Sequence, residues 1–148
     1  MKHIFYILLL LGLAFPAMGQ KNMNIEVLFD GPYQKHKDAV EIHIKGDQLK
    51  KYKLSLYRSL MINSDTAVAS HIEPLVRADA VDAVGKEERL VAGRLLSGFY
   101  CLPPKKGKYR YLIYSNSALK PGSRIVDRVA VIYIEGQASM QEVKNMFK

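Results

Sequence analysis

The pattern of hydrophobic and polar residues is clearest near the end of the chain. Residues Val129–Gly136 (VAVIYIEG) are apolar at nearly every position, and four of the eight are β-branched. Such a run is typical of a strand in the middle of a sheet, with both of its faces covered. Apolar residues then recur at spacings of three and four at Met140, Val143 and Phe147. This spacing predicts a short amphipathic helix after the strand.

Alternation of apolar and polar residues predicts two more strands in the first half of the chain. Residues 39–45 (AVEIHIK) alternate strictly, which predicts a half-exposed strand. Residues 54–62 (LSLYRSLMI) alternate too, although Arg58 interrupts the apolar face. They fit either a strand or the continuation of a short helix that Asp47 caps. Residues 23–36 fit both helical and strand spacing, and a helix is slightly favoured.

The middle of the chain has helical spacing. Over residues 67–89 apolar side chains recur at intervals of three and four, and Pro74 suits the first turn of such a helix. We expect Gly85 to interrupt or end this helix. Helix-forming residues over 87–96 predict a second short helix that ends at Ser97-Gly98, with a short strand over 99–102 after it.

A hairpin and a loop complete the pattern. Residues 103–108 (PPKKGK) have the composition of a turn, and residues 109–114 (YRYLIY) that of a strand leaving it. Residues 115–123 then form a loop. Together these elements predict an α+β fold in a single domain. We expect a mainly antiparallel sheet of about four to five strands with helices packed on it, ending in a strand and a short helix.

The first 19 residues have the features of a signal peptide. A short basic start is followed by an apolar run and then by Ala17 and Gly19, which provide the small side chains that a signal peptidase requires. We therefore expect residues 1–19 to be removed and residues 20–148 to form one exported domain, in the periplasm, cell envelope or extracellular space. The apolar run is shorter than the ~20 residues that a membrane span needs, so we expect no transmembrane segment after cleavage.

The chain contains one cysteine, Cys101, so it cannot form an internal disulfide. Cys101 lies in the apolar run FYCL, where burial is the simplest expectation. A reactive thiol is the alternative, because Lys105 and Lys106 follow closely and cations activate cysteines.

The formal net charge of +8 favours anionic partners without identifying one. Outside the cytoplasm, such partners are anionic envelope components rather than nucleic acid, and another envelope protein is a further candidate. The most concentrated positive charge lies in Lys105, Lys106, Lys108 and Arg110, around the predicted turn. We expect these four cations to form an exposed tip that contacts an anionic surface. Tyrosines interleave with them, but rings that simply pack in the sheet explain that pattern as well.

Residues that could carry catalysis or bind a metal are scattered. Zinc bound by His36, His43 and Glu41 is conceivable, but the spacing matches no common zinc motif. Ser97 is not in a nucleophile motif, and Glu87-Glu88 reads as part of a charged helix face. The sequence therefore predicts no catalytic site, no metal site and no cofactor.

The order of the elements resembles that of a known group of proteins. An exported leader is followed by the EIHIK strand, a helical middle, a hairpin, and the strand IYIEG with a short helix. The chain looks like the small exported proteins of Bacteroidota that are grouped as domains of unknown function, and this resemblance implies no activity or ligand. The sequence favours a non-catalytic binding or interaction module of the cell envelope. The alternatives are a hydrolase-type enzyme whose site is assembled from distant residues and an accessory subunit that is stable only in a complex.

Overall fold

The structure is a computed structural model that describes residues 23–29, 31–122 and 126–147. These residues form one antiparallel sheet of six strands in the order β1-β2-β6-β5-β4-β3. The strands are β1 (Val40–Lys45), β2 (Leu54–Asn63), β3 (Gly85–Val91), β4 (Arg94–Lys105), β5 (Lys108–Asn116) and β6 (Arg128–Gly136). The helical segments are η1 (Asn24–Leu28), η2 (Gly46–Tyr52), α2 (Thr66–Asp79), η3 (Ala80–Asp82), η4 (Ser117–Leu119) and α3 (Met140–Met146). The predicted single antiparallel sheet with helices is confirmed, but the expected four to five strands were too few.

Strand β6 lies at the centre of the sheet. It pairs with β2 on one side and with β5 on the other along almost its whole length. Val131 and Tyr133 belong to the large core on one face of the sheet, whereas Ile134 belongs to a smaller core on the opposite face and Ile132 packs against it. The predicted central position of the strand is therefore confirmed, but of the two faces that were expected to be covered, the second is covered only in part.

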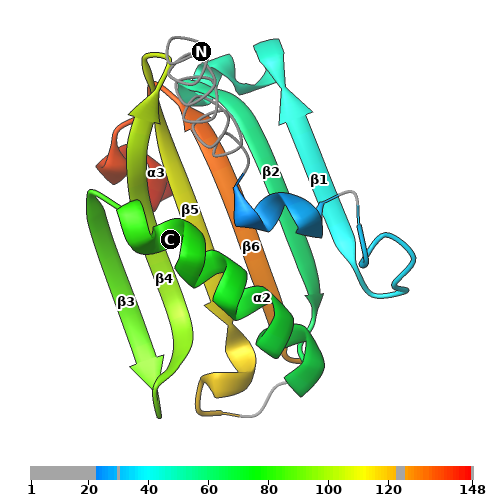
Figure 1. Cartoon of the computed structure of the whole chain (residues 1–148). Helices are drawn as coiled ribbons and strands as arrows, with labels where there is room; N and C mark the ends of the chain where they lie inside the picture. The colour runs from blue at the N-terminus through cyan, green and yellow to red at the C-terminus, as the bar shows by residue number, and fades with distance from the viewer. Residues whose placement is uncertain (1–22, 30, 123–125, 148) are drawn as a thin grey trace, which may run out of the picture.

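Helix α2 and η1 cover one face of the sheet, here called the α2 face (Figure 1). Asp65 caps α2 by accepting a hydrogen bond from the Val68 backbone N–H at 2.8 Å. At the other end of the helix, Asp79 accepts from the Asn24 and Ile25 backbone N–H groups at 2.7 and 2.9 Å, which fixes η1 against α2. The large core lies between these segments and the sheet and includes Ile25, Leu28, Leu60, Ile62, Ile72, Val76, Leu112, Val129 and Val131.

A buried carboxylate also joins α2 to the sheet. Glu73 is 7% exposed, and its Oε1 accepts a hydrogen bond from the Leu95 backbone N–H at 3.0 Å. The guanidinium groups of Arg77 and Arg94 each approach this carboxylate to 3.3 Å. Because the negative charge is both paired and hydrogen-bonded, it is tolerated beneath the helix.

The opposite face, here called the α3 face, is only partly covered. Helix α3 lies behind the sheet in Figure 1, and the smaller core beneath it includes Leu49, Leu54, Tyr111, Ile134, Ala138 and Val143. Away from α3, apolar side chains of the same face stay exposed: Val40 by 52%, Ile42 by 42% and Met61 by 39%. A shift of register between Leu54 and Leu56 places Leu54 in this core, although Leu60 and Ile62 point into the other one.

The helical middle is confirmed up to Asp82, and the helix ends before Gly85, where a break was predicted, but the helical structure expected after Gly85 was wrong. Residues 85–105 form the hairpin of β3 and β4, and its turn consists of Ala92 and Gly93, with φ of 51° and 77°. The predicted break at Ser97-Gly98 lies inside β4, where Gly98 leaves room for the Tyr100 ring. Helix formers such as Glu, Arg and Leu dominate this stretch, but pairing with β5 outweighs their local preference. Pro74 lies in the interior of α2 rather than in its first turn.

Three further predictions have clear outcomes. Of residues 23–36, the structure describes all but residue 30; these contain the short helical segment η1 and no strand, as the favoured prediction had it. Asp47 lies within η2 and does not cap it, because the N-cap residue is Lys45. The hairpin of β4 and β5 is confirmed, but its turn is tighter, since both prolines belong to β4.

The predicted signal peptide over residues 1–19 lies outside the described residues and stays a prediction. Within the ranges that the structure describes, no helix has the length and apolarity needed to cross a membrane.

Candidate functional site

The predicted basic site lies at the turn between β4 and β5, here called the hairpin tip (residues 105–108). Lys106 and Gly107 form the turn with φ of 53° and 75°, and Lys105 faces Lys108 across the strand pair. Lys105 and Lys106 are exposed, whereas Lys108 is half-buried. The structure therefore brings three of the four predicted cations together.

Arg110 does not belong to the hairpin tip. Its Nε donates to the Tyr133 hydroxyl at 2.9 Å, and its Nη1 donates to the Pro103 carbonyl at 3.2 Å. The Tyr133 hydroxyl in turn donates to Glu135 Oε1 at 2.6 Å. Burial, together with the bond to Glu135, raises the pKa of Tyr133. Arg110 is half-buried, and two of its guanidinium nitrogens serve this internal network. Contact of the four cations with an anionic surface stays a prediction.

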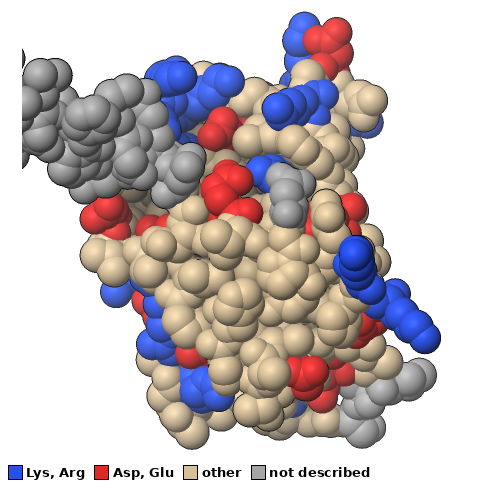
Figure 2. All heavy atoms as spheres, turned by 45° about the vertical axis from the view of Figure 1, so that its right-hand side comes forward, with Lys and Arg blue, Asp and Glu red and all other residues tan. Residues whose placement is uncertain are grey.

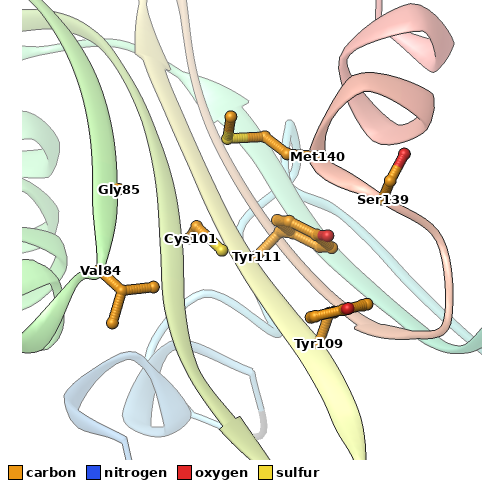
Figure 3. A pocket seen from close by; sticks show the side chains of 7 residues that line it. All are labelled: Val84, Gly85, Cys101, Tyr109, Tyr111, Ser139 and Met140. Carbon is orange, nitrogen blue, oxygen red and sulfur yellow. The ribbon is translucent and has the colours of Figure 1, made fainter.

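A hollow lies between the hairpin tip and the start of α3, on the α3 face of the sheet (Figure 3). Its volume is about 330 Å³, at the lower end of the range for small-molecule pockets. We call it the α3 pocket; its lining consists of Val84, Gly85, Cys101, Tyr109, Tyr111, Ser139 and Met140.

The floor of the α3 pocket is formed by side chains of β4 and β5 that point to the same face of the sheet. Tyr109 and Tyr111 have the same parity on β5 and point to the same face, with ring centroids 6.5 Å apart. Cys101 lies opposite Tyr111 on β4, and Figure 3 shows its sulfur turned toward that ring. Tyr111 is only 1% exposed, whereas Tyr109 is 46% exposed and forms the open side nearest the hairpin tip.

The segment that leads into α3 is held firmly against the sheet. The backbone N–H groups of Gln137 and Ala138 both donate to the Lys53 carbonyl, at 2.8 and 3.0 Å. Ser139 and Glu142 form a reciprocal capping box at the start of α3. The Gln137 side chain donates to the Gly107 carbonyl at 2.9 Å, so the hairpin tip and the α3 pocket are physically linked.

The polar groups of the α3 pocket are neutral. Burial raises the pKa of the Cys101 thiol, so it is protonated at neutral pH and a poor nucleophile. Burial likewise raises the pKa of Tyr111 to about 12, and its hydroxyl donates to the Ala138 carbonyl at 2.7 Å. The lining contains no carboxylate, imidazole or amine. The arrangement can therefore hold an apolar group, but it offers no acid–base pair for catalysis.

A second apolar hollow lies at the other end of α3. Its volume is about 290 Å³, and its lining consists of Ile44, Leu49, Tyr52, Leu54, Tyr57, Ile134, Met146 and Phe147. Met140 and Met146 thus project into hollows at opposite ends of one short helix, and both are more than a third exposed. Methionine side chains suit surfaces that accept apolar groups of varied shape.

The other residues considered for chemistry are not brought together. His36 bonds to Asp38, whereas His43 and Glu41 lie on the edge strand β1. Within the described part of the chain, no group of three or more metal-ligating residues could hold a metal ion.

Glu87 and Glu88 were expected on a helix but lie on β3. Neighbouring residues of a strand point to opposite faces. Glu87 therefore contacts Lys144 on α3, whereas the Glu88 Oε1 atom lies 3.5 Å from the Lys86 Nζ atom. The tyrosines of β5 do not form one platform, because Tyr114 is buried on the α2 face.

The sequence did not indicate the α3 pocket. The sequence predicted strands at Cys101, Tyr109 and Tyr111, which are close to one another along the chain. Ser139 and Met140 come next to them only because β5 pairs with β6. The one available signal was the helical spacing after Gly136, which placed apolar residues next to this strand.

A protein-family model described as "Family of unknown function (DUF6108)" matches residues 12–147. No curated protein and no solved structure matches the chain.

Proposed function

For this chain, which belongs to the family of unknown function (DUF6108), we propose a role as a non-catalytic binding module of the cell envelope. Its ligand is an anionic amphiphile, such as an acyl chain with a charged head group. The chain packs in the α3 pocket, and the head group meets the lysines of the hairpin tip. Envelope location rests on the signal-peptide pattern of residues 1–19.

The observation that carries this proposal is the position of an apolar pocket directly beside a cluster of cations. Tyr109 lines the α3 pocket directly after the hairpin tip, and the Gln137 side chain bonds the turn at Gly107. Because strand alternation directs Lys108 and its partner Lys105 to the other face, the turn with Lys106 is the part of the tip that lies beside the pocket. On the face drawn in Figure 2, lysines and arginines lie mainly around the margin, with acidic side chains among them. Net positive charge alone therefore does not select the site.

The neutral lining favours binding over catalysis. Thiol and phenol groups with raised pKa values stay uncharged at neutral pH, and no base lies among the lining residues to activate them. Apolar walls with a few polar groups at the mouth are typical of sites that hold a ligand by burial and orient it by charge.

The proposal can be tested with dodecanoate and its neutral analogue dodecanol. Isothermal titration of the purified protein should show saturable binding of dodecanoate. The triple variant Lys105→Gln/Lys106→Gln/Lys108→Gln should bind it several-fold more weakly and lose most of the salt dependence, because salt screens the attraction between the removed positive charges and the carboxylate. Met140→Gln should weaken dodecanoate and dodecanol alike, since it makes the pocket wall polar.

A matched control removes the same charge elsewhere. Lys35, Lys37 and Lys50 are exposed and lie away from the α3 pocket, so their change to Gln should leave binding unaltered. Equal binding by both triple variants, or no saturable binding by the wild type, would overturn the proposal.

A further inference from the structure

A row of polar side chains crosses the opposite end of the α3 face. Arg89 on β3 is paired with Ser97 on β4, and Ser97 is paired with Ser115 on β5. Residues paired across neighbouring strands point to the same face, so the guanidinium and the two hydroxyls lie side by side. The next row toward α3 is mainly apolar, with Phe99 and Ile113 in register.

This row lines a hollow of about 500 Å³ that is separate from the α3 pocket. The remaining lining comes from β4, the end of β5 and the segment that follows it: Leu96, Asn116, Ser117, Lys120 and Pro121. The Ser117 hydroxyl accepts from the Arg128 backbone N–H at 2.8 Å, which holds this segment against the start of β6. The hollow thus has a sheet floor and a wall fixed by hydrogen bonds.

The donors on the floor of this hollow are unused within the protein. Within the ranges that the structure describes, neither the Arg89 guanidinium nor the hydroxyl groups of Ser97 and Ser115 form a hydrogen bond or an ion pair. Lys120 also belongs to the lining but has an interaction partner of its own, and the lining contains no carboxylate. The nearest acidic residue of β3 on this face, Glu87, is paired with Lys144.

From this arrangement we propose a binding site for a tetrahedral oxyanion, of the phosphate or phosphomonoester class. A guanidinium offers a fork of N–H donors that matches two oxygens of such an anion, and hydroxyl groups donate to the others. Hydroxyl-rich sites without aromatic stacking residues are poorly suited to neutral sugars alone, so the anion supplies the main attraction. The site does not depend on the function proposed for the α3 pocket.

Titration followed by NMR tests the proposal with inorganic phosphate, glucose 6-phosphate and glucose. Both phosphates should shift the amide signals of Arg89, Ser97 and Ser115 in a saturable way, and glucose should not. A clear preference for glucose 6-phosphate would identify a phosphorylated sugar as the source of the anion; equal binding would identify free phosphate.

Substitutions separate the built site from general attraction to a basic protein. Arg89→Gln and the double change Ser97→Ala/Ser115→Ala should each weaken phosphate binding about tenfold or more, whereas Arg89→Lys should retain part of it. Lys35→Gln, at an exposed lysine in the segment before β1, removes the same charge and should leave phosphate binding unchanged. Conversely, Arg89→Gln should leave dodecanoate binding in the α3 pocket unchanged, so the two proposals fail separately.

Two results would overturn the oxyanion site. One is a set of phosphate-induced shifts that do not saturate and are spread over lysines across the surface. The other is undiminished binding by folded Arg89→Gln, with folding checked by thermal melting of each variant. Because all three substituted residues are at least partly exposed, we expect the variants to fold.

Discussion

Tyr111 and Tyr114 show how the surroundings of a buried hydroxyl group determine its contribution. Both side chains are at most 1% exposed and lie on opposite faces of β5. The Tyr111 hydroxyl donates to the Ala138 carbonyl, which holds the segment before α3. The Tyr114 hydroxyl has no hydrogen-bond partner among the described residues, although the Asn116 amide lies close by. A hydroxyl buried without a partner costs free energy rather than adding stability.

We therefore expect opposite results from removing the two hydroxyl groups. Tyr111→Phe should lower the free energy of unfolding by about 0.5–1.5 kcal/mol, the usual contribution of one hydrogen bond. Tyr114→Phe should leave it unchanged or raise it, because no bond is lost. Chemical denaturation of both variants checks this, and an equal loss from both would show that the Tyr114 hydroxyl is satisfied.

At the scale of elements, β6 contributes unequally to the two cores. Its α2 face is fully covered, whereas its other face is covered only near α3. Ile134 is completely buried beneath α3. Ile132 lies two residues earlier on the same face of β6, further from the helix, and is half-buried. The open part of the α3 face thus begins within the central strand itself.

This difference predicts a gradient of stability along one strand. Ile134→Ala should cost about 2–5 kcal/mol, as usual for a packed core, and Ile132→Ala clearly less. Urea unfolding of the two variants measures the gradient. A loss at Ile132 as large as at Ile134 would mean that something covers the open face in solution.

Some elements could be predicted from the sequence because their pattern and their environment agree. Strand β6 is apolar on both faces and central, and the charged tip at residues 105–108 has the composition of a turn. The prediction for residues 85–96 was wrong because the edge strand β3 is exposed on both faces. It therefore lacks the alternation of apolar and polar residues that indicates a strand. The α3 pocket and the row of Arg89, Ser97 and Ser115 depend on which strands pair, and the local pattern of apolar and polar residues does not reveal that pairing.

At the scale of the whole molecule, buried tyrosines link stability to alkaline pH. Burial raises the pKa of Tyr100, Tyr111 and Tyr114 from an ordinary value of 10 to about 12. Between these values the folded protein holds protons that the unfolded chain releases, so the stability must fall as the pH rises.

We accordingly expect the free energy of unfolding to be constant below pH 10 with respect to these groups and to decrease from pH 10 to pH 12. Guanidinium denaturation at several alkaline pH values measures the decrease, and tyrosinate absorbance should rise together with unfolding. Tyr114→Phe should reduce the slope. Stability that stayed flat through this range would contradict the burial of these phenols.

The central position of β6 also has a consequence for the order in which the protein can be assembled. During synthesis β2 and β5 leave the ribosome before β6, the strand that lies between them. Until then the nascent chain holds two separate groups of strands, β1-β2 and β3-β4-β5, and the edges formed by β2 and β5 have unpaired backbone groups. Long-range pairing of this kind slows folding, because the loops between the strands must close first. The sheet therefore stays incomplete until β6 is available. A delay at that stage exposes the edges of β2 and β5 to pairing with another molecule.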